Sequence, residues 1–377
     1  MPARPPGPEV RQVRGLVGRR VFVDVPFRIH GGDPGWVPPL RMSVYDRISP
    51  RHPATAHQET ALWVACRHGR AVGRISACVD SFFDEYQRVR WAWVGFFDTF
   101  DDPEVAGALF DAAARWSRAR GAETMVGPAS FTTNDELGLM VEGFDTPPAL
   151  MTLQNPRYYE RLWLEDGWAP AMDLLGWAFD RSTALSERQR RTLERIRSRS
   201  SLRVRDLDMG DWDNEIGRFF EVYNAAWARN WGFAPMPEAE VRHLARQLKP
   251  VIRPEWAFGV VDPAGQVVAV CLALPDLNRV MRSVRSGRLL PVGWLRLLAG
   301  RRRVHHARVW ALGVRPEVQN LAVGAMLYGE IVDRLGRDPE MTAEASWTLA
   351  TNHRINSQIE ALGGTQSRRW RLYQKDL

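Results

Sequence analysis

The feature that most constrains the fold of this chain is an internal repeat. Each half carries, in the same order, a hairpin of two apolar strands, a third apolar strand, and a helix that opens on the residues Pro-Glu-Val. We expect these elements at residues 61–67, 71–79, 91–97 and 103–120 in the first half, and at 256–261, 266–274, 307–314 and after Pro316 in the second. The repeat therefore predicts two copies of one α/β (α+β) unit, each a mixed central sheet flanked by helices.

The two copies differ at the junction between the third strand and the helix. Only one residue separates Val105 from Gly107, whereas five separate Val318 from Gly324. The extra residues form a loop where backbone N–H groups without intrahelical partners, together with the helix dipole, can hold a phosphate. Small residues at such a junction are also typical of tight packing, so the loop alone does not decide between the two interpretations.

Length and charge narrow the class of protein. A chain of 377 residues is too long for one ordinary core and predicts two domains. Its net charge of +7 comes almost entirely from Arg, with Lys only at Lys249 and Lys375, and the Arg residues are scattered over both halves. Scattered Arg does not form the basic patch of a nucleic-acid-binding protein, so we expect no nucleic-acid partner.

The cysteines and the first residues indicate the compartment. Cys66, Cys78 and Cys271 lie in apolar strands at spacings that suit neither a disulfide framework nor a metal site, and the histidines also lack metal-ligand spacing. The sequence starts without an apolar leader and contains no run of 18 apolar residues. We therefore expect a cytoplasmic protein without a bound metal.

The predicted organisation follows from these elements. Residues 1–18 are expected to be disordered, and residues 19–180 to form a first domain that begins with a short strand at 19–25 and lacks the phosphate loop. An Arg-rich, solvated helix over 181–205 is expected to link it to a second domain at 206–377, which carries an insertion at 275–306.

At this point the chain resembles a known superfamily. The order hairpin, strand, loop, helix, strand, Asn-led helix and strand is similar to that of GNAT acyltransferases, and Gln319-x-x-Ala322-x-Gly324-Ala325 resembles their acyl-CoA loop. Further blocks resemble a bacterial family of tandem GNAT proteins, some of which are ceramide synthases that join a fatty acyl group to a sphingoid-base amine. These blocks are residues 22–27 with 35–40, 134–136 with 142–145, 155–159, 230–233 and 344–347.

The resemblance implies how the co-substrate acyl-CoA would bind. The backbone of Leu312, Gly313 and Val314 would hold the pantetheine arm, and Asn352 would approach it near the thiol. The pyrophosphate would lie on the loop formed by Gln319, Asn320, Leu321, Ala322, Val323, Gly324 and Ala325. The first Gly usual in this loop is replaced by Ala322, which still permits close approach of a phosphate if its φ is negative. The Tyr that often protonates the leaving thiolate is replaced by Ile359. A thiolate leaves readily without an acid, so positioning, removal of the amine proton and oxyanion donors become the essential elements.

Two residues on one predicted strand are candidates for catalysis. Glu344 and Ser346 alternate on one face. Burial in an apolar strand would raise the pKa of Glu344 toward that of a useful general base. The alternative is a structural Glu paired with one of the many Arg residues.

Candidates for the amine acceptor lie in the first half. Asn134 and Glu136 could reach a substrate at the junction of the domains, or could form a polar loop that caps a following helix. Tyr159 could line an acceptor pocket or pack in the core.

The insertion is the second distinctive segment. It combines apolar residues and Trp294 with flanking Arg clusters, which suits contact with an anionic membrane or a lid over a long acyl chain; a helix pair packed on the protein's own core is the alternative.

The sequence thus predicts an N-acyltransferase that moves an acyl group from acyl-CoA, or from acyl carrier protein, directly to a primary amine. The insertion favours a long-chain donor, a lipid or sphingoid-base amine, and peripheral contact with the inner face of the membrane. Acetylation of a small amine and a non-catalytic acyl-CoA-binding scaffold are the alternatives.

Overall fold

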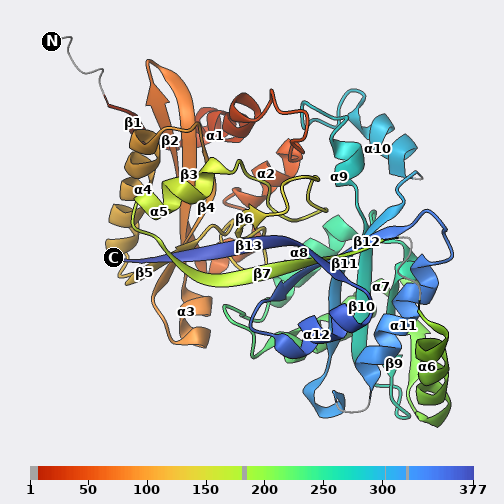
Figure 1. The fold of residues 1–377 in the computed structure, drawn as a ribbon. Coiled ribbons are helices and arrows are strands. Elements are labelled where there is room, and N and C mark those ends of the chain that lie inside the picture. The colour runs from red at the N-terminus through yellow and green to blue at the C-terminus, as the bar shows by residue number, and fades with distance from the viewer. Residues whose placement is uncertain (1–6, 181–184, 302, 320–321) are drawn as a thin grey trace. The chain divides into compact units, whose positions relative to one another are not determined.

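The computed structural model describes residues 7–180, 185–301, 303–319 and 322–377 (Figure 1). The chain divides into two compact units, which are described separately here. Unit 1 contains the residues up to Leu174, together with Asn278–Ala299 and Arg368–Leu377, and unit 2 contains Leu175–Leu277 and Gly300–Ser367. The division differs from the expected one, because most of the insertion and the last strand belong to unit 1.

The sheet of unit 1 is built around the first predicted hairpin. Its strands follow the order β1-β2-β3-β4-β5-β13, and β6 also pairs with β13. Neighbours are antiparallel except β4 and β5, which run parallel. The bounds are β1 Glu9–Gln12, β2 Gln58–Arg67, β3 Arg70–Asp80, β4 Trp91–Thr99, β5 Thr124–Gly127, β6 Leu139–Glu142 and β13 Thr365–Asp376.

The helices of unit 1 bury their apolar residues against this sheet. α4 is the predicted helix: Asp102 caps its first amides, and Leu109, Phe110 and Ala113 are buried. The core of unit 1 is aromatic, because the rings of Phe97, Phe110, Trp163 and Trp168 pack against one another. The bounds are α1 Gly15–Ile29, α2 Arg41–Arg47, α3 Ser81–Gln87, α4 Pro103–Arg118 and α5 Tyr158–Glu165.

Two predictions about the start of the chain are wrong. Residues 9–12 of the expected disordered segment form β1, which pairs with β2 from Glu9 opposite Cys66 onward. The expected strand at residues 19–25 is part of the helix α1, because Phe22, Val25 and Pro26 share one buried helical face.

The sheet of unit 2 repeats this arrangement. Its path runs β7-β12-β11-β10-β9-β8; β8, β9, β10 and β11 are antiparallel neighbours, and β11 and β12 are parallel. The strands are β7 Ala169–Phe179, β8 Arg203–Asp206, β9 Ala257–Val261, β10 Val267–Pro275, β11 His306–Val314 and β12 Thr342–Leu349. The helices are α6 Glu187–Arg199, α7 Trp212–Trp227, α8 Glu238–Leu248, α11 Val323–Leu335 and α12 His353–Ala361.

The linker helix α6 is packed rather than fully solvated. Leu193 is buried, and a Cβ at Gly329 of α11 would lie 2.5 Å from it. Arg197 adds an ion pair of 2.9 Å with Glu330. α6 therefore belongs to the packing of unit 2.

The insertion carries two short helices, α9 Asn278–Met281 and α10 Gly293–Arg301. It is joined to α1 and its following loop by Arg285, which donates hydrogen bonds to the carbonyls of Gly31, Asp33 and Trp36 at 2.9, 2.8 and 3.2 Å. At Gly287 φ is +64°, and a Cβ would lie 2.6 Å from the ring of Phe27. These contacts fix the base of the insertion on unit 1.

Candidate functional site

The candidate site of unit 2 lies where the parallel strands β11 and β12 separate. Their pairing runs from His306 opposite Thr342 to Val309 opposite Ala345 and ends there. The register of β11 against β10 places one extra residue, Trp310, in β11 directly after this point. A bulge bends its strand, so the two strands diverge toward their carboxyl ends.

A buried guanidinium marks the point of divergence. Arg308 is only 3% exposed, and its Nε and Nη2 donate hydrogen bonds of 3.1 and 2.8 Å to the carbonyl of Ser346. Ser346 is the first residue of β12 beyond the pairing with β11, so the guanidinium binds the carbonyl where that ladder has ended.

Glu344 and Ser346 lie on either side of this point. Glu344 is buried and stands opposite Arg308 in the register. The sequence had suggested apolar surroundings for this carboxylate, but a guanidinium-bearing residue lies across from it. Asp276 is also buried and donates its N–H to the carbonyl of His306. The hydroxyl of Ser346 is buried and has no hydrogen-bond partner among the described residues. A donor at this position can bind a carbonyl oxygen or a thiolate that enters between the strands.

The loop and helix start that follow β11 suit an anion. α11 has no side-chain cap in the described part of the chain and no acidic residue in its first turn. Open space surrounds the Cβ position of Gly324. Gln319 donates to the carbonyl of Val314 at 3.2 Å, and Arg354 donates to the carbonyl of Gln319 at 3.1 Å. The loop start is therefore held in place with a cation beside it, while Asn320 and Leu321 lie outside the described residues.

The backbone of Ala322 does not have the negative φ under which the sequence analysis allowed a phosphate to approach closely. Its φ is +56°, in the left-handed region, where a Cβ is strained and Gly is favoured. The condition of a negative φ is therefore not met. The backbone nevertheless adopts the conformation that a Gly would take there.

The remaining acyl-CoA candidates take different positions. Gly313 is required by close packing, because a Cβ would lie 2.3 Å from the ring of Trp227. The side chain of Val323 is buried, whereas Leu312 and Ala325 are partly exposed. Asn352 caps α12 and accepts the N–H of Ile355 at 3.3 Å. Ile359, at the position of the missing acid, is packed with Leu175, Trp177 and Ala345.

A polar chain that the sequence did not predict fixes the end of β12. The indole of Trp177 donates to the hydroxyl of Thr348 at 2.9 Å, and that hydroxyl donates to Asn356 at 2.7 Å. Asn356 in turn donates to the carbonyls of Leu349 and Ala350. Roles for Arg308, Arg354 and Asn356 were thus not predicted from the sequence. The one available signal was the charged Arg308 inside the apolar run of β11.

Aromatic residues cover one face of β11. The ring of Tyr223 is stacked on Trp310 with an interplanar angle of 7° and on Trp227 with one of 27°. Burial raises the pKa of Tyr223 to about 12, so its hydroxyl stays protonated at neutral pH. Next to this stack is an apolar cavity bounded by α7, α8, β9 and β10, whose lining includes Trp212, Phe219, Phe220, Leu248, Ile252 and Trp310.

In unit 1 the corresponding space is filled. Pairing of β4 with β5 ends at Trp93 and Val126, but Ala129 then donates its N–H to Val94 at 2.8 Å. A Cβ at Gly95 would lie 1.9 Å from the carbonyl oxygen of Ala129, so the backbones are in direct contact. The carboxylate of Asp102 already occupies the first amides of α4, at 3.1 and 3.2 Å. In unit 1 the gap between the parallel strands is therefore closed, and the first amides of α4 are occupied by a carboxylate.

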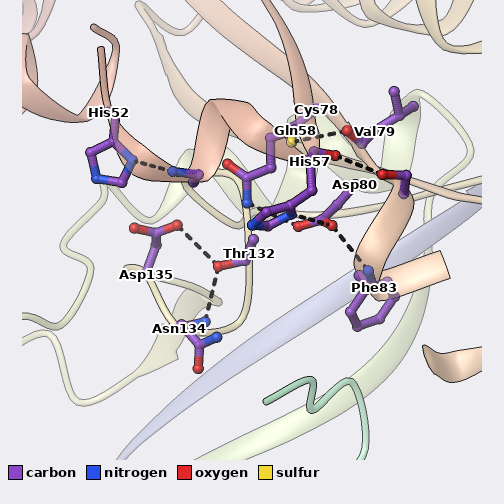
Figure 2. A network of polar contacts seen from close by, with 12 residues as sticks. His52, His57, Gln58, Cys78, Val79, Asp80, Phe83, Thr132, Asn134 and Asp135 are labelled. Carbon is purple, nitrogen blue, oxygen red and sulfur yellow. Dashed lines mark hydrogen bonds and ion pairs between the residues drawn. The ribbon is translucent and has the colours of Figure 1, made fainter. Parts of the chain in front are cut away.

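The polar residues of unit 1 form a network of their own (Figure 2). Asp135 binds Arg47 through two hydrogen bonds of 2.9 and 2.8 Å, and Arg47 donates to Gln58 at 3.1 Å. Gln58 donates to Asp80, which also bonds His57 at 2.8 Å. Burial raises the pKa of Asp80, but hydrogen bonds from His57, the Phe83 N–H and Gln58 together hold it below its ordinary value.

The acceptor candidates border or lie outside this network. The N–H of Asn134 donates to Thr132, and Glu136 is exposed on a turn closed by the bridge of Ala129 with Leu137. The turn leads into β6, so the alternative that these residues cap a helix is wrong. Tyr159 is buried in the core, where its oxygen accepts the N–H of Thr99 at 2.9 Å, instead of lining an open pocket.

The two sheets, with the separated parallel strands of unit 2, can be compared with those of solved structures. Similar solved structures are a tandem GNAT protein from the clavulanic acid biosynthesis pathway, with a TM-score of 0.53 at 16% identity over 98% of each chain, and a GCN5-related N-acetyltransferase from Sphaerobacter thermophilus, with a TM-score of 0.54 at 12% identity over 99% of this chain and 97% of that one. The fold is that of a tandem GNAT protein.

Sequence comparison narrows the class. The chain is 37% identical to the bacterial ceramide synthase of Caulobacter vibrioides over 94% of both chains, and 32% identical to protein YghO of Escherichia coli K12 over 95% of this chain and 93% of that one. It therefore belongs to the family of tandem GNAT proteins that includes these two relatives. No established family model matches the sequence.

Proposed function

We propose that unit 2 binds acyl-CoA and transfers its acyl group to the primary amine of a long-chain lipid, such as a sphingoid base. The observation that carries this proposal is the end of the β11–β12 pairing at Val309 and Ala345, with the Ser346 hydroxyl at the point of divergence. Pantetheine carries amide groups along its length, which can bond to strand backbone that has lost its partner.

The pyrophosphate would be bound at the start of α11. The first amides of α11, which have no side-chain cap among the described residues, and the helix dipole attract its charge, and Arg354 adds a cation near the loop. Unit 1 serves as an internal contrast, because its equivalent helix is capped by Asp102 and carries Glu104 in the first turn.

The reaction needs no covalent enzyme intermediate. The amine nitrogen attacks the thioester carbonyl carbon, the carbon–sulfur bond breaks, and CoA leaves as a thiolate. The proton lost by the amine passes to Glu344 and from there to the thiolate. Ser346 donates a hydrogen bond to the developing oxyanion. Ile359 at the usual acid position is compatible with this scheme, because the thiolate is a stable leaving group.

The preference for a long-chain donor and a lipid amine rests on the similarity to one relative. A relative 37% identical over 94% of the chain bears the name ceramide synthase, and a ceramide is an N-acylated sphingoid base. A lipid amine would in turn bring the enzyme to the inner face of the membrane.

The test begins with thermal shifts in the presence of acetyl-CoA, palmitoyl-CoA and free CoA, with palmitate as a control for detergent-like effects. A ligand that binds the native state raises the melting temperature, and at equal concentration a tighter ligand raises it more. We expect the largest shift with palmitoyl-CoA, followed by CoA-thiol release when sphinganine is added. Equal shifts for acetyl-CoA and CoA would favour a small-amine acetyltransferase. Binding without turnover with any amine would favour a scaffold, and the absence of a shift would favour acyl carrier protein as the donor.

A further inference from the structure

The tip of the insertion presents a cluster of exposed apolar side chains. Leu290 is 75% exposed, and Leu298, Val292, Leu295 and Trp294 are 55, 51, 50 and 43% exposed. These five residues lie within nine positions of the chain, so they form one apolar tip rather than scattered surface residues. A cluster of this kind marks an interaction surface.

The tip is held in a defined conformation. A Cβ at Gly293 would lie 2.2 Å from the carbonyl oxygen of Arg288, so α10 begins in tight contact with the preceding loop. Trp294 donates its backbone N–H to Leu289 at 2.8 Å and its indole N–H to Pro291 at 3.0 Å. Its polar hydrogens are thus already bonded within the tip, which lowers the cost of moving the indole out of water.

The base of the same segment is strongly cationic. Between Leu277 and Val304 the sequence contains eight Arg and no Asp or Glu. Arg279, Arg282 and Arg285 line an open hollow together with Ser283, Gly32 and Pro34 of unit 1. The hollow suits a phosphate-bearing headgroup, because guanidinium groups bind phosphate well.

An apolar tip on a cationic base matches the interface of an anionic bilayer. Apolar and Trp side chains enter the boundary between headgroups and acyl chains, while Arg residues remain among the phosphates. A second copy of this chain is a poor partner, since an isologous contact of residues 278–299 would bring the five Arg of this segment in one copy against the same five of the other, without a carboxylate from either segment.

We propose that residues 278–299 form the membrane-docking surface of the protein, with the apolar tip at Leu290–Leu298 inserted among the acyl chains of an anionic phospholipid bilayer and Arg279, Arg282 and Arg288 on its headgroup phosphates. The biological purpose of this surface rests on the proposed lipid acceptor, but the binding itself does not.

The test is sedimentation of the full-length protein with vesicles, without acyl-CoA or amine. Vesicles of phosphatidylglycerol and phosphatidylcholine are compared with vesicles of phosphatidylcholine alone. We expect binding to the anionic vesicles that weakens as salt is added. The triple variant Leu290→Ser/Trp294→Ser/Leu298→Ser should lose at least tenfold in affinity, and Arg282→Gln/Arg288→Gln should lose about fivefold for each charge removed. The matched control is Tyr86→Ser/Phe100→Ser/Leu164→Ser, at side chains of unit 1 that are 42, 41 and 46% exposed, and it should bind like the unchanged protein.

A second measurement does not depend on the stability of these variants. A fluorescent label that brightens in apolar surroundings is attached at Trp294→Cys, with Cys66→Ser as background because Cys78 and Cys271 are buried. The label should brighten with anionic vesicles, whereas a label at Tyr86→Cys should not. Equal vesicle binding by the triple variant, or no brightening at position 294, would overturn the proposal. A triple variant that changes from dimer to monomer in light scattering, with unaltered vesicle binding, would instead identify a self-association surface. Because no donor is present, failure of acyl transfer would leave these outcomes unchanged.

Discussion

Arg308 on β11 donates two hydrogen bonds to the carbonyl of Ser346 on β12, at 3.1 and 2.8 Å, at the point where the two strands stop pairing. Arg308→Leu removes both donors, so the buried carbonyl of Ser346 loses its hydrogen bonds. The buried Glu344, which stands opposite position 308 in the register, then no longer has a guanidinium across from it. We expect a loss of about 3–5 kcal/mol in the free energy of unfolding, measured by urea denaturation. Arg242→Leu, at an exposed ion pair with Glu238, is the control and should cost less than about 1 kcal/mol. Similar losses for the two variants would show that Arg308 does not stabilise the separated strands.

Ser346→Ala should reduce catalysis and leave the fold intact. The hydroxyl has no partner in the described structure, so its removal should be neutral or stabilising by about 1 kcal/mol. If it donates to the oxyanion, kcat should fall about 100-fold while the affinity for acyl-CoA is retained. Ser76→Ala and Ser117→Ala are matched controls, because both hydroxyls are buried in unit 1 and are likewise unpartnered among the described residues. Unchanged kcat in Ser346→Ala would remove this residue from the mechanism.

Gly324→Glu should weaken acyl-CoA binding. The Cβ position is open, so the substitution fits, but it places a carboxylate in the first turn of α11, where the pyrophosphate is proposed to bind. Repulsion at short range should lower the affinity about tenfold or more in calorimetric titration. Gly217→Glu is the control, since this exposed helical glycine in α7 also has open space around it. Equal affinity in both variants would refute the phosphate-loop assignment.

Ala322→Gly should stabilise unit 2. The left-handed φ of +56° costs an Ala about 1 kcal/mol, and a Gly adopts this conformation without strain. Thermal unfolding should therefore show a higher melting temperature. Ala299→Gly, at an exposed position in α10, should show the opposite sign, with a loss of about 0.5–1 kcal/mol. A lower melting temperature for Ala322→Gly would mean that the loop does not hold this conformation in solution.

Asp84 on α3 should make the stability of unit 1 depend on pH. Burial raises the pKa of this carboxyl to about 6, although it accepts a hydrogen bond from the N–H of Trp91. A folded-state pKa above the unfolded value near 4 means that the stabilising contribution is complete below pH 4 and is lost as the pH rises toward 6. Asp84→Asn should therefore be stabilising at pH 7 to 8, by less than about 2 kcal/mol because solvent screens the partly exposed group, and this gain should vanish at pH 4.

The control for this prediction is Asp145→Asn, at a side chain that is 94% exposed, which should change the free energy of unfolding by less than about 0.5 kcal/mol. Urea unfolding at a series of pH values measures the difference. A gain from Asp84→Asn that stays the same from pH 4 to pH 8 would contradict the linkage.

The repeat in the sequence predicted the fold because hairpins, caps and strand periodicity are local signals. The hairpin of β2 and β3, the Asp102 cap of α4 and the strand β11 all follow from neighbouring residues. The start of α1 was misread because Val21, Val23 and Val25 alternate as in a strand, whereas the packing of Phe22, Val25 and Pro26 on one face selects the helix.

The chemistry of the site was less accessible from sequence. Arg308 faces Glu344 only through the register of two strands, and the two residues lie 36 positions apart in the sequence. The left-handed conformation of Ala322 likewise depends on how the backbone is packed. The same holds for Ala129, whose backbone closes the gap between the parallel strands of unit 1. The residue types were visible in the sequence, but the distances between them were not.

The path of β13 has a consequence for the making of this protein. Gln374 and Lys375 pair with Val126 and Met125, so a strand that is synthesised after the residues of unit 2 completes the sheet of unit 1. Until then β5 has an unpaired edge, and a nascent chain must keep that edge from other strands. A fragment that stops at residue 180 lacks β13 and is therefore expected to aggregate rather than fold.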